Sequence, residues 1–234
     1  MFVPLSDENA LKSIPFQYVT VSLIAINVIV FLLTLGSSDV RTIASFAVVP
    51  AELVKVGIGG GPAYGPLDVL PVPERYTLVS YMFLHGSWMH LISNMLFLWV
   101  FGDNVEDAMG HMRFLMFYLA CGIVAGLVHT MAMPSSPRPL VGASGAVAGI
   151  VSAYLMLHPR VNVWVLVMRY IPLRLSATIV LGVWIAIQVV MVSIPQQGAV
   201  AWWAHIGGLI AGAVLILFMR RPGVVLFDRG LSLR

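Results

Sequence analysis

Stretches without a charged residue recur along the chain and divide it into apolar segments separated by polar connections. A helix that crosses a lipid bilayer needs about 20 mostly apolar residues. The stretches of about that length predict six membrane-spanning helices: Tyr18–Gly36, Thr77–Gly102, Phe114–Met133, Leu140–His158, Leu175–Ile194 and Gly198–Met219. The second stretch is too long for one straight helix and contains Gly86, so we expect its helix to begin near Ser87.

The polar connections complete the predicted organisation. Residues 1–17 are polar, and the first apolar stretch is long, which favours a retained span over a cleaved signal peptide. The longest connection, residues 37–77, contains Gly59-Gly60-Gly61-Pro62, which does not fit a helix interior, so we expect this loop at the membrane surface. The other connections are Gly102–Gly110, Pro134–Pro139, Pro159–Arg174 and Pro195–Gly198. The predicted fold class is an all-α bundle over residues 18–219, with a basic tail at residues 220–234.

The composition agrees with a membrane protein. Of the 234 residues, 59% are hydrophobic and 10% are charged, whereas a soluble domain has about 45–50% apolar and about 25% charged residues. So few charges do not cover a water-facing surface, which excludes an ordinary soluble domain, a coiled coil and a disordered chain. The net charge of +3 is small and no basic run alternates with aromatic residues, so we expect no binding of nucleic acid.

The positions of Lys and Arg predict the orientation, because cytoplasmic loops of membrane proteins are enriched in these residues. If the N-terminus is cytoplasmic, nine of the 13 basic residues lie on the inner side and four on the outer side. The inner set is Lys12, Arg113, Arg160, Arg169, Arg174, Arg220, Arg221, Arg229 and Arg234, and the outer set is Arg41, Lys55, Arg75 and Arg138. Both termini are therefore expected in the cytoplasm.

Four polar residues inside the predicted spans are candidates for function, because polar groups in a bilayer are costly. They are His90 and Asn94 in the second span, Ser144 in the fourth and His205 in the sixth. These three spans run in the same direction, from outside to inside. At 1.5 Å per residue, all four side chains lie within about 12 Å of the outer ends of their helices. The predicted topology thus brings a hydroxyl, two imidazoles and an amide into one layer.

Ser144 has a glycine on either side, at Gly142 and Gly145, within the motif Gly142-Ala143-Ser144-Gly145. The proline-rich stretch just before this motif predicts that the fourth helix starts late, with Ser144 at its N-terminus. Free backbone N–H groups and the positive end of the helix dipole there suit a developing oxyanion. The alternative is a face of small residues that lets helices pack closely. Both interpretations can hold together.

His205 precedes Gly208 and Gly212, which form a GxxxG face suited to close packing against the fourth helix. A neutral imidazole there can take the proton of Ser144. The alternative is a histidine that only hydrogen-bonds a neighbouring helix. The other histidines, His85, His111, His129 and His158, receive no role.

His90 and Asn94 are four residues apart and share one helix face, so both can donate hydrogen bonds to an anionic oxygen. A metal site is weakly indicated, because no predicted span contains a carboxylate and the His-Glu-x-x-His pattern is absent.

These motifs resemble those of the rhomboid family of intramembrane serine proteases. The matching elements are His90-Leu-Ile-Ser-Asn94, Gly142-Ala143-Ser144-Gly145, the segment from Ala204 to Gly212 with His205, and the Glu-xxx-Gly-xxx-Phe stretch from Glu106 to Phe114. The three motifs around His90, Ser144 and His205 occur in the family's order on the second, fourth and sixth helices, the Glu106 stretch follows the second span, and the resemblance extends from about Tyr76 to Gly212.

The resemblance implies a Ser–His dyad with Ser144 as nucleophile and His205 as general base and then general acid. His90, Asn94 and the backbone N–H of Ser144 would form the oxyanion hole, with no metal and no cofactor. The substrates would be other membrane proteins, cut in or near a transmembrane segment. In this family, substrate access is thought to involve the second and fifth helices.

The chain departs from the family at two places. Many members carry an aromatic residue four positions after the nucleophile, where this chain has Ala148, which leaves the ring partner of His205 unassigned. The loop pair Trp-Arg is replaced by Tyr76-Thr77, with Arg75 just before it.

The sequence leaves two alternative functions. One is a catalytically inactive rhomboid-like protein that binds transmembrane helices, for which loss of Ser144 or His205 would be the usual sign. The other is a small transporter, which would predict charged groups near mid-membrane and often a repeated half. Short loops and the lack of a targeting presequence favour a prokaryotic plasma membrane, with the site near the extracytoplasmic face. The sequence does not specify the oligomeric state.

Overall fold

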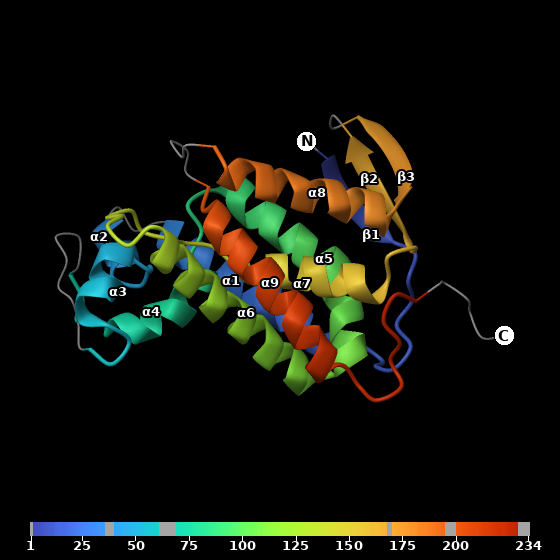
Figure 1. The fold of residues 1–234 in the computed structure, drawn as a ribbon, viewed down its shortest axis with the longest axis horizontal. Coiled ribbons are helices and arrows are strands. Elements are labelled where there is room, and N and C mark those ends of the chain that lie inside the picture. The colour runs from blue at the N-terminus through green and yellow to red at the C-terminus, as the bar shows by residue number, and fades with distance from the viewer. Residues whose placement is uncertain (1, 36–39, 61–68, 168–169, 195–199, 229–234) are drawn as a thin grey trace.

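The protein forms a bundle of six long helices in a computed structural model that describes residues 2–35, 40–60, 69–167, 170–194 and 200–228 (Figure 1). Each long helix overlaps one of the six predicted apolar stretches. The helices are α1 Tyr18–Leu35, α5 Trp88–Met109, α6 His111–Ala132, α7 Ser144–Leu157, α8 Ala177–Val192 and α9 Trp202–Met219. Four predicted features fall partly or wholly outside the described residues: the connection 37–77, the connection 195–198, the basic tail with Arg229 and Arg234, and Arg169.

Three of these helices, α1, α6 and α9, are long and apolar enough to cross a membrane. Two more, α7 and α8, are apolar but shorter, with 14 and 16 residues. The helix α5 has 22 residues but carries three acidic ones in its last two turns. The structure is therefore that of a largely helical membrane protein with three candidate spans in the described part of the chain, and the count of six spans stays a prediction.

The short helix α7 is the centre of the bundle, with α5, α6 and α9 packed around it (Figure 1). Along α7, Ala146, Ala148, Ile150, Ala153 and Leu157 are fully buried. Small residues dominate its first two turns, so the neighbouring helices approach its backbone closely. The helix α8 lies at the edge of the bundle, and many of its large apolar side chains, Ile187 and Val190 among them, are exposed.

The helix α5 begins at Trp88, directly after Ser87, as predicted. Ser87 caps it, because its hydroxyl accepts a hydrogen bond from the His90 N–H at 3.2 Å. The helix continues beyond Gly102, where the apolar stretch ends, to Met109. It does so because Glu106 and Asp107 are buried and hydrogen-bonded rather than exposed in a connection, and the half-buried Asp103 accepts hydrogen bonds from Asn104.

Two of these carboxylates tie the N-terminal segment to the bundle. Glu106 is fully buried and accepts hydrogen bonds from the Val19 N–H at 3.0 Å, the Thr20 N–H at 2.8 Å and the Thr20 hydroxyl at 2.7 Å. A negative charge is stabilising at this place because it faces the positive end of the α1 dipole. Asp107 accepts from the backbone N–H groups of residues 12–14 at 2.6–3.1 Å.

The prediction of an all-α fold is wrong in one respect, because the described residues also include a three-stranded antiparallel sheet. Its strands are β1 Phe2–Asp7, β2 Asn162–Val167 and β3 Ile171–Ser176, in the order β1-β2-β3. The segment Pro159–Arg174 was predicted as a connection, although Val163 and Val165 alternate with the exposed Trp164 as in a half-buried strand. Residues 2–7 pair with this segment, although the paired residues are 155 or more positions apart in the sequence. No local pattern reveals a partner at that distance.

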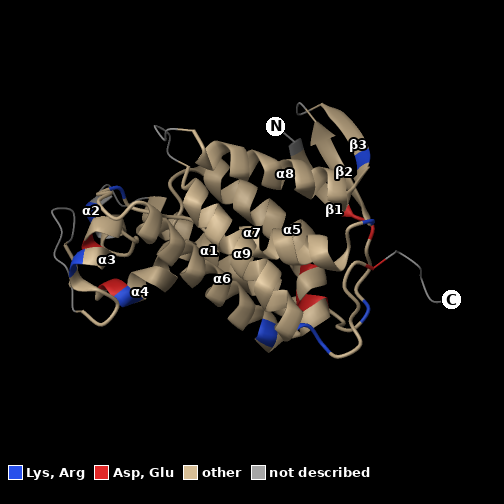
Figure 2. Ribbon diagram, in the orientation of Figure 1, with Lys and Arg blue, Asp and Glu red and all other residues tan. Residues whose placement is uncertain are grey.

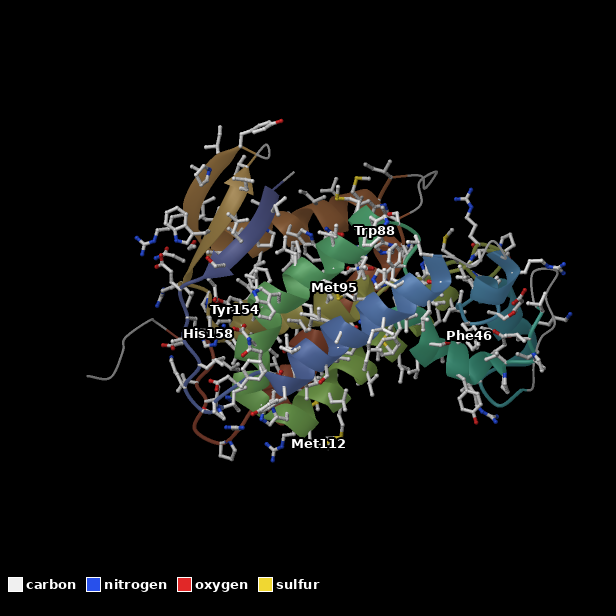
Figure 3. The ribbon with its side chains drawn as sticks, turned by 180° about the vertical axis from the view of Figure 1, so that it is seen from behind. Phe46, Trp88, Met95, Met112, Tyr154 and His158 are labelled. Carbon is white, nitrogen blue, oxygen red and sulfur yellow. The ribbon has the colours of Figure 1, made fainter. Side chains whose placement is uncertain are left out.

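The long first connection contains helical turns rather than an open loop. They are α2 Val40–Ala44, α3 Pro50–Val56 and the start of α4 Glu74–Ser80, which is followed by the 3₁₀ turn η1 Tyr81–Phe83. These elements lie at the end of the bundle opposite the sheet (Figure 1). Charged residues gather at these two ends, and the middle of the bundle is almost free of them (Figure 2). In Figure 3, Phe46 and Trp88 lie toward the α2–α4 end, and Tyr154 and His158 toward the end that holds the sheet.

Candidate active site

Ser144 and His205 meet at the end of the bundle that faces α2–α4. Ser144 is the first residue of α7, and His205 lies in the first turn of α9. The Ser144 Oγ and the His205 Nε2 are 2.9 Å apart, although 61 positions separate the two residues. His205 is 8% exposed, whereas the Ser144 side chain is more accessible. A hydroxyl and an imidazole nitrogen are thus within hydrogen-bond distance at the start of a helix.

Glycines make this approach of α7 and α9 possible. A Cβ atom built on Gly208 would lie 1.9 Å from the Gly145 carbonyl oxygen, and one built on Gly212 would lie 2.1 Å from the Gly149 carbonyl oxygen. Any side chain at these positions would push the two backbones apart. The GxxxG face of α9 therefore sits directly on the small-residue face of α7 and determines how closely Ser144 and His205 approach.

His90 and Asn94 converge on Gly142, two residues before Ser144. A Cβ on Gly142 would lie 2.5 Å from both the Cε1 and Nε2 atoms of the His90 ring, and 3.7 Å from the Asn94 Nδ2. Gly142 has a φ of +116°, a conformation that favours glycine. Its N–H donates to the Tyr81 carbonyl at 2.9 Å, which fixes the loop beneath the two side chains. The structure thus brings all four predicted polar residues to one place.

A fifth residue, His85, belongs to this group, although no role was predicted for it from the sequence. The Asn94 Nδ2 lies 3.1 Å from the His85 Nε2, and His85 is 7% exposed. An amide nitrogen only donates, so the His85 Nε2 accepts this hydrogen bond. The contact holds the Asn94 side chain against the His85 ring.

The second ring nitrogen of His205 has a partner that was not predicted from the sequence. The His205 Nδ1 lies 2.7 Å from the Oε1 of Gln188, a residue of α8 that is 3% exposed. Gln188 is a polar residue inside the fifth apolar stretch, so the cost of polar groups in a bilayer could have singled it out. Ala148 contributes no aromatic ring, and two tryptophans flank the imidazole instead. The centroid of Trp184 on α8 is 6.0 Å from that of His205, and the centroid of Trp202 is 5.8 Å away.

A cavity of about 890 Å³ opens beside these groups. Its wall includes Ser144 and His205, the α5 residues His90 and Asn94, and apolar side chains of α5 and α8 such as Phe97 and Ile187. Its volume is within the roughly 300–1,000 Å³ of ligand-binding pockets, and its wall presents both apolar and polar groups.

A family model for the rhomboid domain matches residues 73–222, well over half of the chain. This chain belongs to the rhomboid family. The matched region includes Ser144, His205, His90 and Asn94, and also His85 and Gln188. The helix α1 and the strand β1 lie before it.

Other rhomboid proteins are similar to this chain over most of its length. RHOMBOID-like protein 5 of Arabidopsis thaliana is 33% identical over 150 residues, which are 64% of this chain and 46% of that protein. The mitochondrial RHOMBOID-like protein 6 of the same plant is 30% identical over 67% of this chain and 49% of its own length. Rhomboid protease GluP of Bacillus subtilis is 29% identical over 76% of this chain and 29% of its own length. The chain thus spans less than half of each of these relatives.

Proposed function

We propose that this rhomboid is an intramembrane serine endopeptidase that hydrolyses peptide bonds in or near the transmembrane segments of other membrane proteins. The observation that carries the proposal is the 2.9 Å approach of the Ser144 Oγ to the His205 Nε2 in the wall of a cavity of about 890 Å³. Membership of a family that includes a rhomboid protease in Bacillus subtilis supports it.

In the proposed reaction, the Ser144 Oγ attacks the carbonyl carbon of the scissile bond while its proton moves to the His205 Nε2. The tetrahedral intermediate then collapses, the C–N bond breaks, and His205 gives that proton to the leaving amine. A water molecule next attacks the acyl-enzyme, with His205 again taking a proton, and the carboxylate product leaves as Ser144 regains its hydrogen. No metal and no cofactor takes part in this scheme.

The negative oxygen of the intermediate is assigned to His90, Asn94 and the backbone N–H of Ser144. Both side chains converge on Gly142, beside the start of α7. The N–H groups in the first turn of a helix have no acceptor within the helix, and they lie at the positive end of its dipole. Donors held in place before the reaction stabilise developing charge without reorganising.

The length of α7 supports a site below the membrane surface. At 1.5 Å per residue its 14 residues extend about 21 Å, less than the roughly 30 Å of a hydrocarbon core. Since α7 is central and enclosed by other helices, it does not need to span the bilayer. A substrate helix hides its amides, so it must unwind locally in the cavity before it can be cut.

We further propose six spans, cytoplasmic termini and a site near the extracytoplasmic face. The two ends of the chain lie on the same side of the bundle as far as they are described, which supports this orientation. The Lys12 Nζ is 3.6 Å from the Asp228 Oδ2, at the end of the bundle that holds the sheet. A prokaryotic plasma membrane is the proposed location. One relative is bacterial, while others are named mitochondrial or chloroplastic, so expression and fractionation in a bacterial host is the first check.

The test is labelling of the purified chain in detergent by a serine-directed fluorophosphonate, followed by mapping of the modified peptide. We expect the label on Ser144, and we expect Ser144→Ala and His205→Ala to abolish both labelling and cleavage of a fluorescent transmembrane substrate. Ser152→Ala is the matched control, because this serine lies on the same helix and bonds only the Gly149 carbonyl in the described contacts.

If Ser144→Ala cleaved the substrate at the wild-type rate, Ser144 would not be the nucleophile. A folded wild-type chain that neither takes the label nor cuts the substrate would favour the inactive, helix-binding alternative.

A further inference from the structure

We infer that Gln188 is a positioning residue that sets the tautomer and the orientation of His205. The inference rests on the proposed function, because the proposed base must present an unprotonated Nε2 to Ser144. It assigns a task to α8, a helix that carries neither the nucleophile nor the base.

The hydrogen bonds of Gln188 fix which way its amide points. The Gln188 Nε2 donates to the Trp184 carbonyl at 3.0 Å, and a carbonyl only accepts. The Oε1 therefore faces His205, at 2.7 Å from the Nδ1. Since an amide oxygen also only accepts, the Nδ1 must carry the proton.

This proton assignment decides the state of the other ring nitrogen. A neutral imidazole carries one proton, so a protonated Nδ1 leaves a lone pair on the Nε2. That lone pair faces the Ser144 hydroxyl at 2.9 Å, which therefore donates to it. The chain Trp184 carbonyl, Gln188, His205 and Ser144 has one consistent set of donors and acceptors, and it leaves the imidazole ready to accept the serine proton.

The same helix also limits the tilt of the imidazole ring. Trp184, one turn before Gln188 on α8, lies beside the ring with an interplanar angle of 30°. Both contacts come from α8, so the orientation of the base depends on where α8 sits. Gln188 thereby performs, with a neutral acceptor, the orienting task that a carboxylate performs in a Ser-His-Asp triad.

The first measurement does not need an active enzyme. We would record ring ¹⁵N shifts of the full chain labelled at histidine, in detergent, and assign His205 by its absence in His205→Ala. The wild type should show a protonated Nδ1. Gln188→Met, which keeps the size of the side chain but removes the acceptor, should lose this preference, whereas Gln17→Met at the other end of the chain should keep it. A wild-type His205 protonated on the Nε2 would overturn the inference whether or not the protein cleaves anything.

The second measurement is the rate of fluorophosphonate labelling and of substrate cleavage. Gln188→Met should lower kcat by about 10- to 100-fold, the effect of a lost buried hydrogen bond, with little change in KM. Gln188→Glu keeps an acceptor and should recover most of this loss. Its carboxylate stabilises the imidazolium, so the acidic limb of the pH–rate profile should move up by roughly one to three pH units.

The comparison of pH profiles is matched, because both variants share the same titratable surroundings. The described titratable groups that act on His205 are His90 on α5 and His129 on α6, and neither is altered. A Gln188→Met variant within twofold of the wild-type kcat would overturn the inference. A Gln188→Glu variant as slow as Gln188→Met at every pH, with no shift of the limb, would show a packing role only and would also overturn it. Neither result bears on the proposed role of Ser144 as nucleophile, which Ser144→Ala tests separately.

Discussion

The substitution Gly208→Ala tests whether the contact of α7 and α9 sets the geometry of the dyad. The new Cβ would lie 1.9 Å from the Gly145 carbonyl oxygen, whereas ordinary van der Waals contact begins at 3.4 Å. The nearest atoms are backbone atoms, so no side chain can turn away to make room. The two helices must separate locally by about 1.5 Å, the difference between these distances.

We expect this separation of the helices to increase the distance between Ser144 and His205 by nearly the same amount. Ser144 directly precedes Gly145, and His205 lies one turn before Gly208 on the same helix. The Oγ–Nε2 distance of 2.9 Å would then exceed hydrogen-bond range. A misplacement of about 1 Å costs roughly 100-fold in rate, so we expect at least that loss. Overpacking of this kind also lowers the free energy of unfolding by about 1–3 kcal/mol.

The assay is the rate of fluorophosphonate labelling, measured together with the thermal unfolding midpoint in the same detergent. Gly182→Ala is the matched control, because a Cβ at this position on α8 meets nothing within 4 Å. It should leave both quantities unchanged or raise the midpoint slightly. A Gly208→Ala variant labelled within about threefold of the wild-type rate, at an unchanged midpoint, would refute the argument that this glycine contact positions the dyad.

Two further predictions concern other parts of the chain. His90→Ala and Asn94→Ala should each lower kcat by roughly 10²–10³-fold with a small effect on KM, as for loss of one oxyanion donor; an unchanged kcat in substrate titrations of either variant would remove that residue from the oxyanion hole. Burial raises the pKa of Asp7 from 3.8 to about 6, against the opposing hydrogen bond from Tyr154. The folded state therefore binds this proton more tightly than the unfolded state, and stability should fall as the pH rises from about 4 to about 6. Asp7→Asn should flatten this part of the curve of unfolding midpoint against pH, and an identical slope in both proteins would contradict the assignment.

Local patterns along the sequence were sufficient to predict the six long helices and most residues of the candidate site. Apolar stretches located all six long helices, because a long apolar helix needs no partner to be recognised. The proline-rich stretch before Ser144 indicated the late start of α7, and the spacing of Gly208 and Gly212 indicated a close helix contact. Ser144, His205, His90 and Asn94 were found by one argument, the cost of polar groups inside apolar segments.

Contacts between distant segments were decided by the tertiary structure alone. The strand β1 pairs with β2, which lies more than 150 residues away along the chain. The residues of β1 do not alternate strictly between apolar and polar, so its sequence does not indicate this pairing. The acidic end of α5 was predicted as a connection because it carries charged residues. It is helical because backbone N–H groups of the N-terminal segment stabilise its carboxylates, and no local pattern predicts these contacts.

The surroundings of His205 show the same division most clearly. Short segments of the chain were enough to predict the proposed reacting residues, since a serine between glycines and a histidine before a GxxxG face are local features. The groups that hold the imidazole are visible only in the folded bundle, because Gln188 and Trp184 contact it from α8, 17 or more positions away along the chain. Chemistry that resides in one side chain can be predicted from a motif, whereas the orientation of that side chain depends on helices that meet only when the bundle folds.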